Sequence, residues 1–169
     1  MKQILALTYL LAVATLAMTT PVLAQDPVSY QVGLVIEGNV LRFDQESNCP
    51  GTRPNGEVCI AGDSGAEIVF TLRGRDEGWV FSRFEIRDPA ANWGDTLPGP
   101  AARDFGAANE YGQMDLPPGV GRSLVVQDAN SQPIAVQYRV VARNTESGQQ
   151  SSPAHGVIDN DGGASGRGD

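Results

Sequence analysis

Cys49 and Cys59 are the only two cysteines of the chain, and their thiols are the first candidates for chemistry. The segment between them is dense in proline, glycine and asparagine, which favour turns. Two cysteines with a short spacer are typical of a disulfide in an exported protein, because the periplasm and the extracellular space are oxidising. We therefore expect a Cys49–Cys59 disulfide that fastens a hairpin-like loop. A redox pair is not expected, since the Cys-x-x-Cys spacing is absent.

Ser64 lies in Gly62-Asp63-Ser64-Gly65, which resembles the start of the nucleophile segment of trypsin-like proteases. A serine nucleophile needs a histidine base and usually a carboxylate that orients the histidine. His155 is the single histidine, it follows the serine instead of preceding it, and its immediate neighbours include no acid. We expect Ser64 in a β-turn and no catalytic residue. One histidine also supplies too few ligands for a zinc site, so we expect no metal and no cofactor.

The run Asp159-Asn160-Asp161-Gly162 resembles the opening of a calcium-binding loop, in which alternate oxygen side chains surround the ion. The glutamate that closes such a loop at its twelfth position has no counterpart in this sequence. We therefore expect residues 159–169, which are rich in glycine and aspartate, to form a disordered acidic tail. Calcium dependence stays open as an alternative.

The segment from Pro89 to Gly119 has five prolines and little alternation of apolar and polar residues, so we expect one long irregular loop. Trp93, Phe105 and Tyr111 lie in it. Loops on a rigid scaffold often carry binding residues, and aromatic side chains supply much of the energy at contacts. We therefore predict these three aromatics as binding residues. The alternative is that they only hold the loop against the rest of the domain.

Residues 1–24 have the order of a secretory signal peptide: Lys2 comes first, an apolar run from Ile4 to Met18 follows, and Val22-Leu23-Ala24 precedes the expected cleavage. We expect a periplasmic or secreted protein that does not insert into a membrane after cleavage. The whole chain has a net charge of −8, and without Lys2 the remaining 11 basic and 20 acidic residues give −9. Nucleic-acid binding is not expected, because phosphate binding needs clustered cations.

Apolar and polar residues alternate with a period of two through most of the remaining chain, as in half-buried strands. Gly38-Asn39 has the residue types of a tight hairpin turn, with a returning strand from Val40 to Phe43. Short strands separated by turn residues predict an all-β fold, a single antiparallel immunoglobulin-like β-sandwich of about 7–8 strands. We place this domain at residues 25–158. A closed barrel is the alternative, because strand number does not separate the two architectures.

The nine apolar side chains on the expected inner faces of the strands should be buried together between the two sheets. They are Val32, Leu34, Phe70, Phe84, Ile86, Val126, Val136, Tyr138 and Val140.

The row from Tyr138 to Asn144, with Gly148 and Ser151-Ser152-Pro153 after it, resembles the penultimate strand and final turn of fibronectin type III-like domains. In these immunoglobulin-like domains a tyrosine hydroxyl bonds upstream backbone at a strand corner. The resemblance implies this role for Tyr138.

The whole chain after the signal also resembles, more loosely, the bacterial DP-EP family. The likeness rests on the strand ending from Phe81 to Asp88-Pro89 and on the terminal run from Ile158 to Gly162. This resemblance implies a β-sandwich and no particular chemistry.

No nucleophile with its base, metal cluster or phosphate-binding loop is recognisable in the sequence. We therefore expect an exported, non-catalytic binding or interaction module with an unknown protein or carbohydrate partner, and no enzymatic activity. Two alternatives stay open: an exported hydrolase whose site is built from dispersed acidic residues, and a calcium-dependent adhesion or matrix component.

Overall fold

The computed structural model describes residues 27–62, 64–74, 78–116 and 119–161. The expected signal peptide lies outside the described residues, as do Asp63 and residues 162–169. The described part contains nine strands and one short helix. They are β1 (Val28–Glu37), β2 (Val40–Phe43), β3 (Glu57–Ile60), β4 (Ala66–Arg73), β5 (Trp79–Arg87), α1 (Gly99–Asp104), β6 (Gln113–Met114), β7 (Ser123–Asp128), β8 (Pro133–Asn144) and β9 (Ala154–Asp161).

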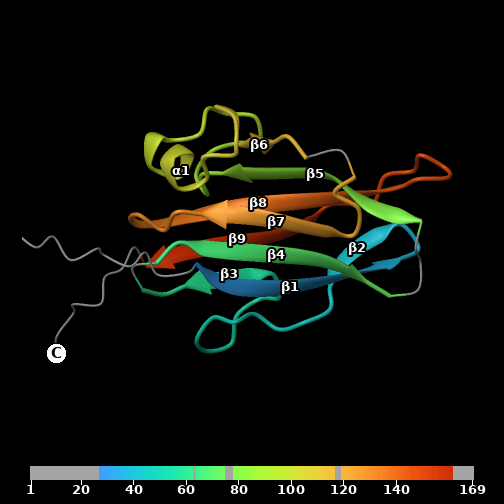
Figure 1. The fold of residues 1–169 in the computed structure, drawn as a ribbon, viewed down its shortest axis with the longest axis horizontal. Helices are drawn as coiled ribbons and strands as arrows, with labels where there is room; N and C mark the ends of the chain where they lie inside the picture. The colour runs from blue at the N-terminus through green and yellow to red at the C-terminus, as the bar shows by residue number, and fades with distance from the viewer. Residues whose placement is uncertain (1–26, 63, 75–77, 117–118, 162–169) are drawn as a thin grey trace, which may run out of the picture.

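The strands form two sheets that face each other (Figure 1). One sheet has the order β2-β1-β4-β7, and the other has the order β3-β9-β8-β5-β6. The two sheets remain separate layers, so the predicted all-β sandwich is confirmed and the closed-barrel alternative does not apply. No helix among the described residues is long and apolar enough to cross a membrane.

Two strand pairs correct the expectation of a purely antiparallel sandwich of 7–8 strands. β1 pairs with β4 in parallel, and β3 pairs with β9 in parallel, so both sheets are mixed. The short strands β3 and β6 lie at the edges of their sheet and bring the number of strands in the described part to nine. Alternation along a strand fixes which face is buried, but it does not determine which strand becomes the neighbour.

The core lies between the two sheets and contains all nine side chains predicted for it, each at most 4% exposed. Phe84 stacks on Tyr138 at 5.6 Å between ring centroids, and Phe70 contacts both rings at 5.2 Å. Aromatic rings bury large apolar areas and interact favourably at such separations. This cluster joins β4 of one sheet to β5 and β8 of the other.

The segment from Pro89 to Gly119 is not irregular throughout, which corrects the predicted loop. It forms the short helix α1 and the two-residue strand β6, which pairs with β5. Leu97, Ala101 and Phe105 join the hydrophobic core, so burial of these side chains fixes the segment against the sandwich.

The first three residues of the predicted disordered tail lie in a strand, which corrects that prediction for them. Asp159, Asn160 and Asp161 belong to β9 and pair with Ala135, Ile134 and Pro133 of β8. The pairing with β8 holds this polar stretch in the sheet, a contact that composition alone does not reveal. The rest of the tail, from Gly162, lies outside the described residues.

The disulfide between Cys49 and Cys59 is confirmed, with 5.0 Å between the two Cα atoms. It joins the loop after β2 to the edge strand β3. Asn48 reinforces this connection, because its side chain exchanges hydrogen bonds with the backbone N–H and C=O of Cys59. The disulfide and the Asn48 hydrogen bonds together hold β3 at the edge of its sheet, beside β9.

Candidate functional site

The three aromatics predicted as binding residues are not brought together. Phe105 has no exposed surface and lies in the core, while Tyr111 is 46% exposed on the loop before β6. Trp93 is partly buried and contacts charged residues of the sheet. Of the three, only Trp93 is part of a polar cluster, whereas Phe105 has the structural role that we considered as the alternative.

Trp93 lies against the outer face of the five-stranded sheet. The guanidinium carbons of Arg87 and Arg139 are 4.7 and 4.5 Å from its ring centroid, and the His155 ring centroid is 5.8 Å away. Arg139 is opposite Glu85 in the β5–β8 register and opposite His155 in the β8–β9 register. The strand pairing therefore places these charged side chains on one face, and cation–π attraction holds the indole over them.

His155 does not have the surroundings of a catalytic base. Partial burial lowers its pKa below the usual 6.5, and the nearby charges of Arg139 and Arg87 lower it further. Its described neighbours are the indole of Trp93 and these cations, with no hydrogen bond or ion pair to a carboxylate. The carbonyl of Ser64 accepts a hydrogen bond from Asn130, in the turn before β4. These contacts give His155 and Ser64 no shared catalytic geometry.

A groove of about 490 Å³ lies beside Trp93, which we call the Trp93 groove. Glu85, at its base, is 5% exposed and forms an ion pair with Arg139. The polar residues that line the Trp93 groove come from β5, β6 and β8 and from the loops beside them. They are Ser82, Arg83, Glu85, Trp93, Gln113, Asp115 and Arg139.

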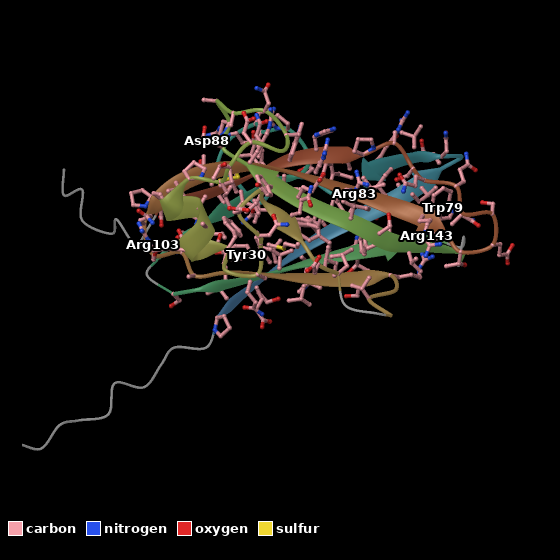
Figure 2. The ribbon with its side chains drawn as sticks, turned by 90° about the horizontal axis from the view of Figure 1, so that it is seen from above. Tyr30, Trp79, Arg83, Asp88, Arg103 and Arg143 are labelled. Carbon is pink, nitrogen blue, oxygen red and sulfur yellow. A yellow bond between two sulfur atoms is a disulfide. The ribbon has the colours of Figure 1, made fainter. Side chains whose placement is uncertain are left out.

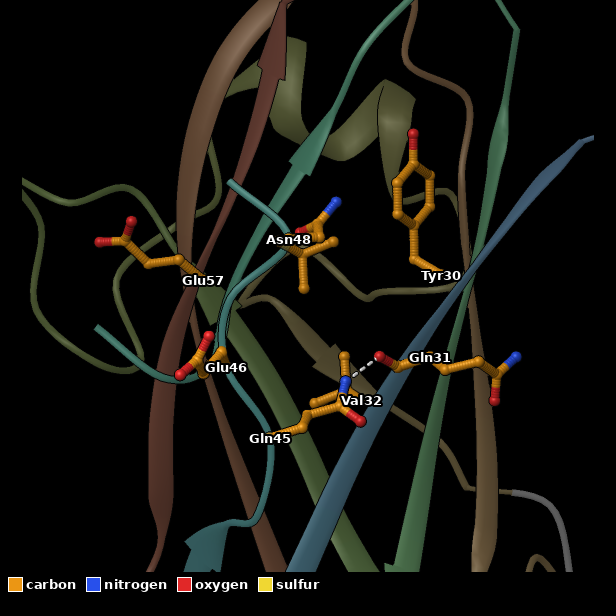
Figure 3. A pocket seen from close by; sticks show the side chains of 9 residues that line it. Tyr30, Gln31, Val32, Gln45, Glu46, Asn48 and Glu57 are labelled. Carbon is orange, nitrogen blue, oxygen red and sulfur yellow. Dashed lines mark hydrogen bonds between the residues drawn. The ribbon is translucent and has the colours of Figure 1, made fainter. Parts of the chain in front are cut away.

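A much smaller hollow of about 40 Å³ lies between the loop after β2 and strand β1 (Figure 3). Tyr30, Gln31 and Asn48 are among its lining residues, and Gln45 donates a hydrogen bond to the Gln31 carbonyl. A hollow of this volume takes a few water molecules and no larger ligand.

A second polar cluster, which the sequence did not predict, lies inside one end of the sandwich. It consists of Asp104, Asp128, Asn130 and Asn160, each 2% exposed, and we call it the oxygen cluster. Asp104 ends α1, Asp128 ends β7, Asn130 follows in the next turn, and Asn160 belongs to β9. Figure 1 shows α1 and the carboxyl ends of β7 and β9 at the same end of the molecule.

Hydrogen bonds connect the members of the oxygen cluster. Oδ1 of Asp128 accepts from the Asn160 amide at 3.0 Å and from the Asn130 backbone N–H at 2.8 Å. Oδ1 of Asp104 accepts from the backbone N–H and the hydroxyl of Ser131. The amide of Asn130 donates to the Gly62 carbonyl at 2.7 Å, which ties the cluster to the loop before β4.

Four oxygens of the oxygen cluster are buried and have no hydrogen-bond partner among the described residues. They are Asp104 Oδ2, Asp128 Oδ2, Asn130 Oδ1 and Asn160 Oδ1. Buried polar atoms in native proteins are nearly always bonded to protein, water or an ion. Burial raises the pKa of Asp128 from 3.8 to about 6, and the nearby charge of Asp104 adds to this rise. The cluster is therefore short of positive charge and of hydrogen-bond donors.

The sequence contained one signal of this cluster. The run that begins at Asp159 resembles a calcium loop and so indicates oxygen ligands, although its composition predicts a disordered acidic tail. The other members are separated from Asn160 by 30 residues or more, and only the fold brings them to it. The backbone of Asn130 is also unusual, since its φ of 46° is the only positive value for a non-glycine residue in the described part.

No protein-family model matches the chain, and no curated protein matches it. Among solved structures it is similar to rusticyanin from Thiobacillus ferrooxidans, at 12% identity over 79% of each chain with a TM-score of 0.30. It is also similar to reduced rusticyanin, at 11% identity over 79% of this chain and 81% of that one, with a TM-score of 0.31.

Rusticyanin is a cupredoxin, an electron-transfer copper protein. The comparison therefore contradicts the predicted non-catalytic binding or interaction module, and that prediction is not retained. The likeness is too loose to transfer redox chemistry to this chain.

The donors of the chain do not fit a cupredoxin copper site. Such a site uses two histidines and a cysteine thiolate with a weak axial ligand. This chain has one histidine, and both cysteines form the disulfide. The described residues also hold no group of three or more histidine, cysteine, aspartate or glutamate side chains suited to a metal ion. The oxygen cluster is not such a group, because it contains only two carboxylates, and its other two members are the amides Asn130 and Asn160.

Proposed function

We propose that this chain is an exported calcium-binding protein whose oxygen cluster holds one Ca²⁺ ion. The observation that carries this proposal is a set of four buried oxygens that have no hydrogen-bond partner in the described part of the chain, two from carboxylates and two from amides. A divalent cation at this point would contact atoms that otherwise lack a partner, and it would offset the charges of Asp104 and Asp128.

The donor chemistry favours calcium over other cations. Ca²⁺ takes six to eight oxygen ligands from carboxylates, amide and backbone carbonyls and water, in a flexible geometry. Mg²⁺ keeps several waters and demands a strict octahedron, whereas zinc and copper prefer nitrogen and sulfur. The cluster offers only oxygens, and the carbonyls of Gly62 and Ser64 lie beside Asn130. Bound calcium would fix the ends of α1, β7 and β9 to one another.

Export agrees with this proposal. We infer that residues 1–24 are a signal peptide and that the mature chain is periplasmic or secreted, and the Cys49–Cys59 disulfide fits an oxidising compartment. Extracellular calcium sites bind with dissociation constants on the order of 10⁻⁴–10⁻³ M. A site of moderate affinity would therefore be filled outside the cell. We also propose, from the resemblances given above, that the sandwich is immunoglobulin-like and related to the DP-EP family.

Calcium titration of the purified mature protein after treatment with a chelator tests the proposal. Calorimetry should detect one calcium site per chain. At a calcium concentration of about 100 times Kd, linkage adds roughly 2.7 kcal/mol to the free energy of unfolding. For a domain of this size that raises Tm by about 5–10 °C. Magnesium at the same concentration should raise Tm much less.

Asp128→Asn keeps the shape of the side chain and removes one negative charge, so it should weaken calcium binding by at least about tenfold. Asp159→Asn is the matched control, because Asp159 is the exposed neighbour of Asn160 in the same strand. This control should bind calcium as the wild type does. A wild-type protein that shows neither calorimetric binding nor a Tm shift with calcium raised to about 0.1 M, roughly 100 times the weakest expected Kd, would overturn the proposal and indicate that buried water serves these oxygens.

A further inference from the structure

The outer face of the five-stranded sheet carries a second polar site, which shares no residue with the oxygen cluster. Its centre is Trp93, which two arginines hold in place. Arg87 is itself fixed by hydrogen bonds to Gln137 Oε1 at 2.6 and 3.0 Å and to the Ala91 carbonyl at 2.5 Å. Arg139 is fixed by its ion pair with Glu85. The indole is therefore presented in one orientation before any ligand binds.

Basic residues gather on two adjacent inner strands of this sheet, β5 and β8. β5 and β8 together contain Arg83, Arg87, Arg139 and Arg143, and Glu85 is their only acid. Figure 2 shows Arg83 and Arg143 on these two strands. The whole chain has a net charge of −8, so this concentration of arginine is local. Two of these arginines, Arg83 and Arg139, line the Trp93 groove. An anionic group of a ligand would be attracted to Arg83, since Glu85 already pairs with Arg139.

Arg83 is the cation of the Trp93 groove with the most freedom to bind a ligand. Its side chain is exposed, and it forms no ion pair within the described part of the chain. Glu85 and Asp115 add carboxylates to the lining, and Ser82 and Gln113 add neutral hydrogen-bonding groups. The two carboxylates disfavour a densely charged phosphate polymer, but they are good acceptors for hydroxyl groups.

A second hollow of about 330 Å³ extends this face across the sheet. Asn55, Glu57, Gln137 and His155 are among its lining residues, from β3, β8, β9 and the loop before β3. The Trp93 groove covers β5, β6 and β8, so the Trp93–His155 contact lies between the two hollows. Five strands about 4.8 Å apart span roughly 19 Å from the first to the last. This face suits an extended ligand better than a small ion.

We propose that the Trp93 groove and the adjoining hollow bind a linear acidic saccharide, whose sugar units carry carboxylate groups. Arg83 would bind a carboxylate through its planar guanidinium. Asp115, Gln113 and Ser82 would bond sugar hydroxyls, and Trp93 would cover an apolar face of one sugar ring. This site does not depend on calcium in the oxygen cluster, and the two proposals can fail separately.

Calorimetric titration of the full mature chain with an oligogalacturonate tests this site at low salt, with calcium and, separately, with a chelator. Binding should weaken as salt rises, because exposed charges are screened. Arg83→Gln should weaken binding about tenfold, since it removes a charge-assisted bond. Trp93→Ala should weaken binding by a similar factor. Quenching of Trp93 fluorescence on binding, absent in Trp93→Ala, would place the saccharide on this face.

Arg42→Gln is the matched control, because Arg42 is an exposed arginine on β2 of the other sheet. It should bind the oligogalacturonate as the wild type does. Three ligands separate the alternatives: a neutral maltooligosaccharide, single-stranded DNA and polyglutamate, all of which should bind at least about tenfold more weakly. The proposal is overturned if the acidic saccharide does not bind, if Arg83→Gln leaves its affinity unchanged, or if any of the three competitors binds equally well.

Discussion

The hydroxyl of Tyr138 donates a hydrogen bond of 2.7 Å to the backbone carbonyl of Gly56, 82 residues earlier in the chain. The resemblance to fibronectin-like domains implied a bond from this tyrosine to upstream backbone at a strand corner. The bond instead reaches the loop between Cys49 and Cys59, just before the edge strand β3. It joins the aromatic core to the segment that the disulfide also fastens. Burial of the ring raises the pKa of the Tyr138 hydroxyl far above its usual value of 10, so it stays protonated and donates.

Tyr138→Phe should lower the free energy of unfolding by about 1 kcal/mol, because it removes one buried hydrogen bond and keeps the ring. The loss stays small because the Gly56 carbonyl also accepts from the backbone N–H of Val157. Urea denaturation of both proteins measures the difference. A loss above about 3 kcal/mol would show that the Gly56 carbonyl is left without a partner.

Phe84→Ala should cost about 3–5 kcal/mol, because it removes a fully buried ring and leaves a cavity. The ring contacts Phe70 and Tyr138, so the change opens the junction between the two sheets. Chemical denaturation followed by circular dichroism gives the value. A variant as stable as the wild type would mean that Phe84 lies on the wrong face.

Replacing both cysteines by serine should lower stability by at most about 3 kcal/mol, since the disulfide closes a short loop in the unfolded chain. β3 should lose protection most, because it is an edge strand that only β9 pairs with. Hydrogen exchange measured by mass spectrometry can compare Glu57–Ile60 with the central strand β8. Equal loss of protection in both would indicate that the disulfide has no local role.

Asp128 predicts how stability depends on pH when calcium is removed. Its folded pKa is about 6, and an unfolded aspartate titrates near 3.8, so the folded state binds the proton more tightly. Protonated Asp128 therefore stabilises the folded state, and this stabilisation is fully present below pH 3.8. It is lost as pH rises through the folded pKa of about 6, which lowers the free energy of unfolding by about 3 kcal/mol in all. Urea denaturation in chelator at acid and neutral pH measures this loss. Asp128→Asn should remove most of it, and Asp159→Asn should retain it.

The sequence by itself determined which faces of the strands are buried. The alternation around Val32 and Leu34, and again around Val136 and Val140, placed these side chains in the core because successive residues of a strand point to opposite faces. The hairpin at Gly38 was predictable for the same local reason, since its φ of 66° suits glycine. The disulfide followed from the number of cysteines and their spacing.

Only the tertiary structure decided which strands became neighbours and which polar groups met inside. The parallel pairs β1–β4 and β3–β9 depend on how the chain passes between sheets, which alternation does not encode. Asp104, Asp128 and Asn160 each look like ordinary polar residues in the sequence, and the fold buries them at one point. The two aromatics Trp93 and Phe105 of one loop have different environments for a related reason. Phe105 packs in the core, whereas Trp93 contacts the arginines on the outer face of the sheet.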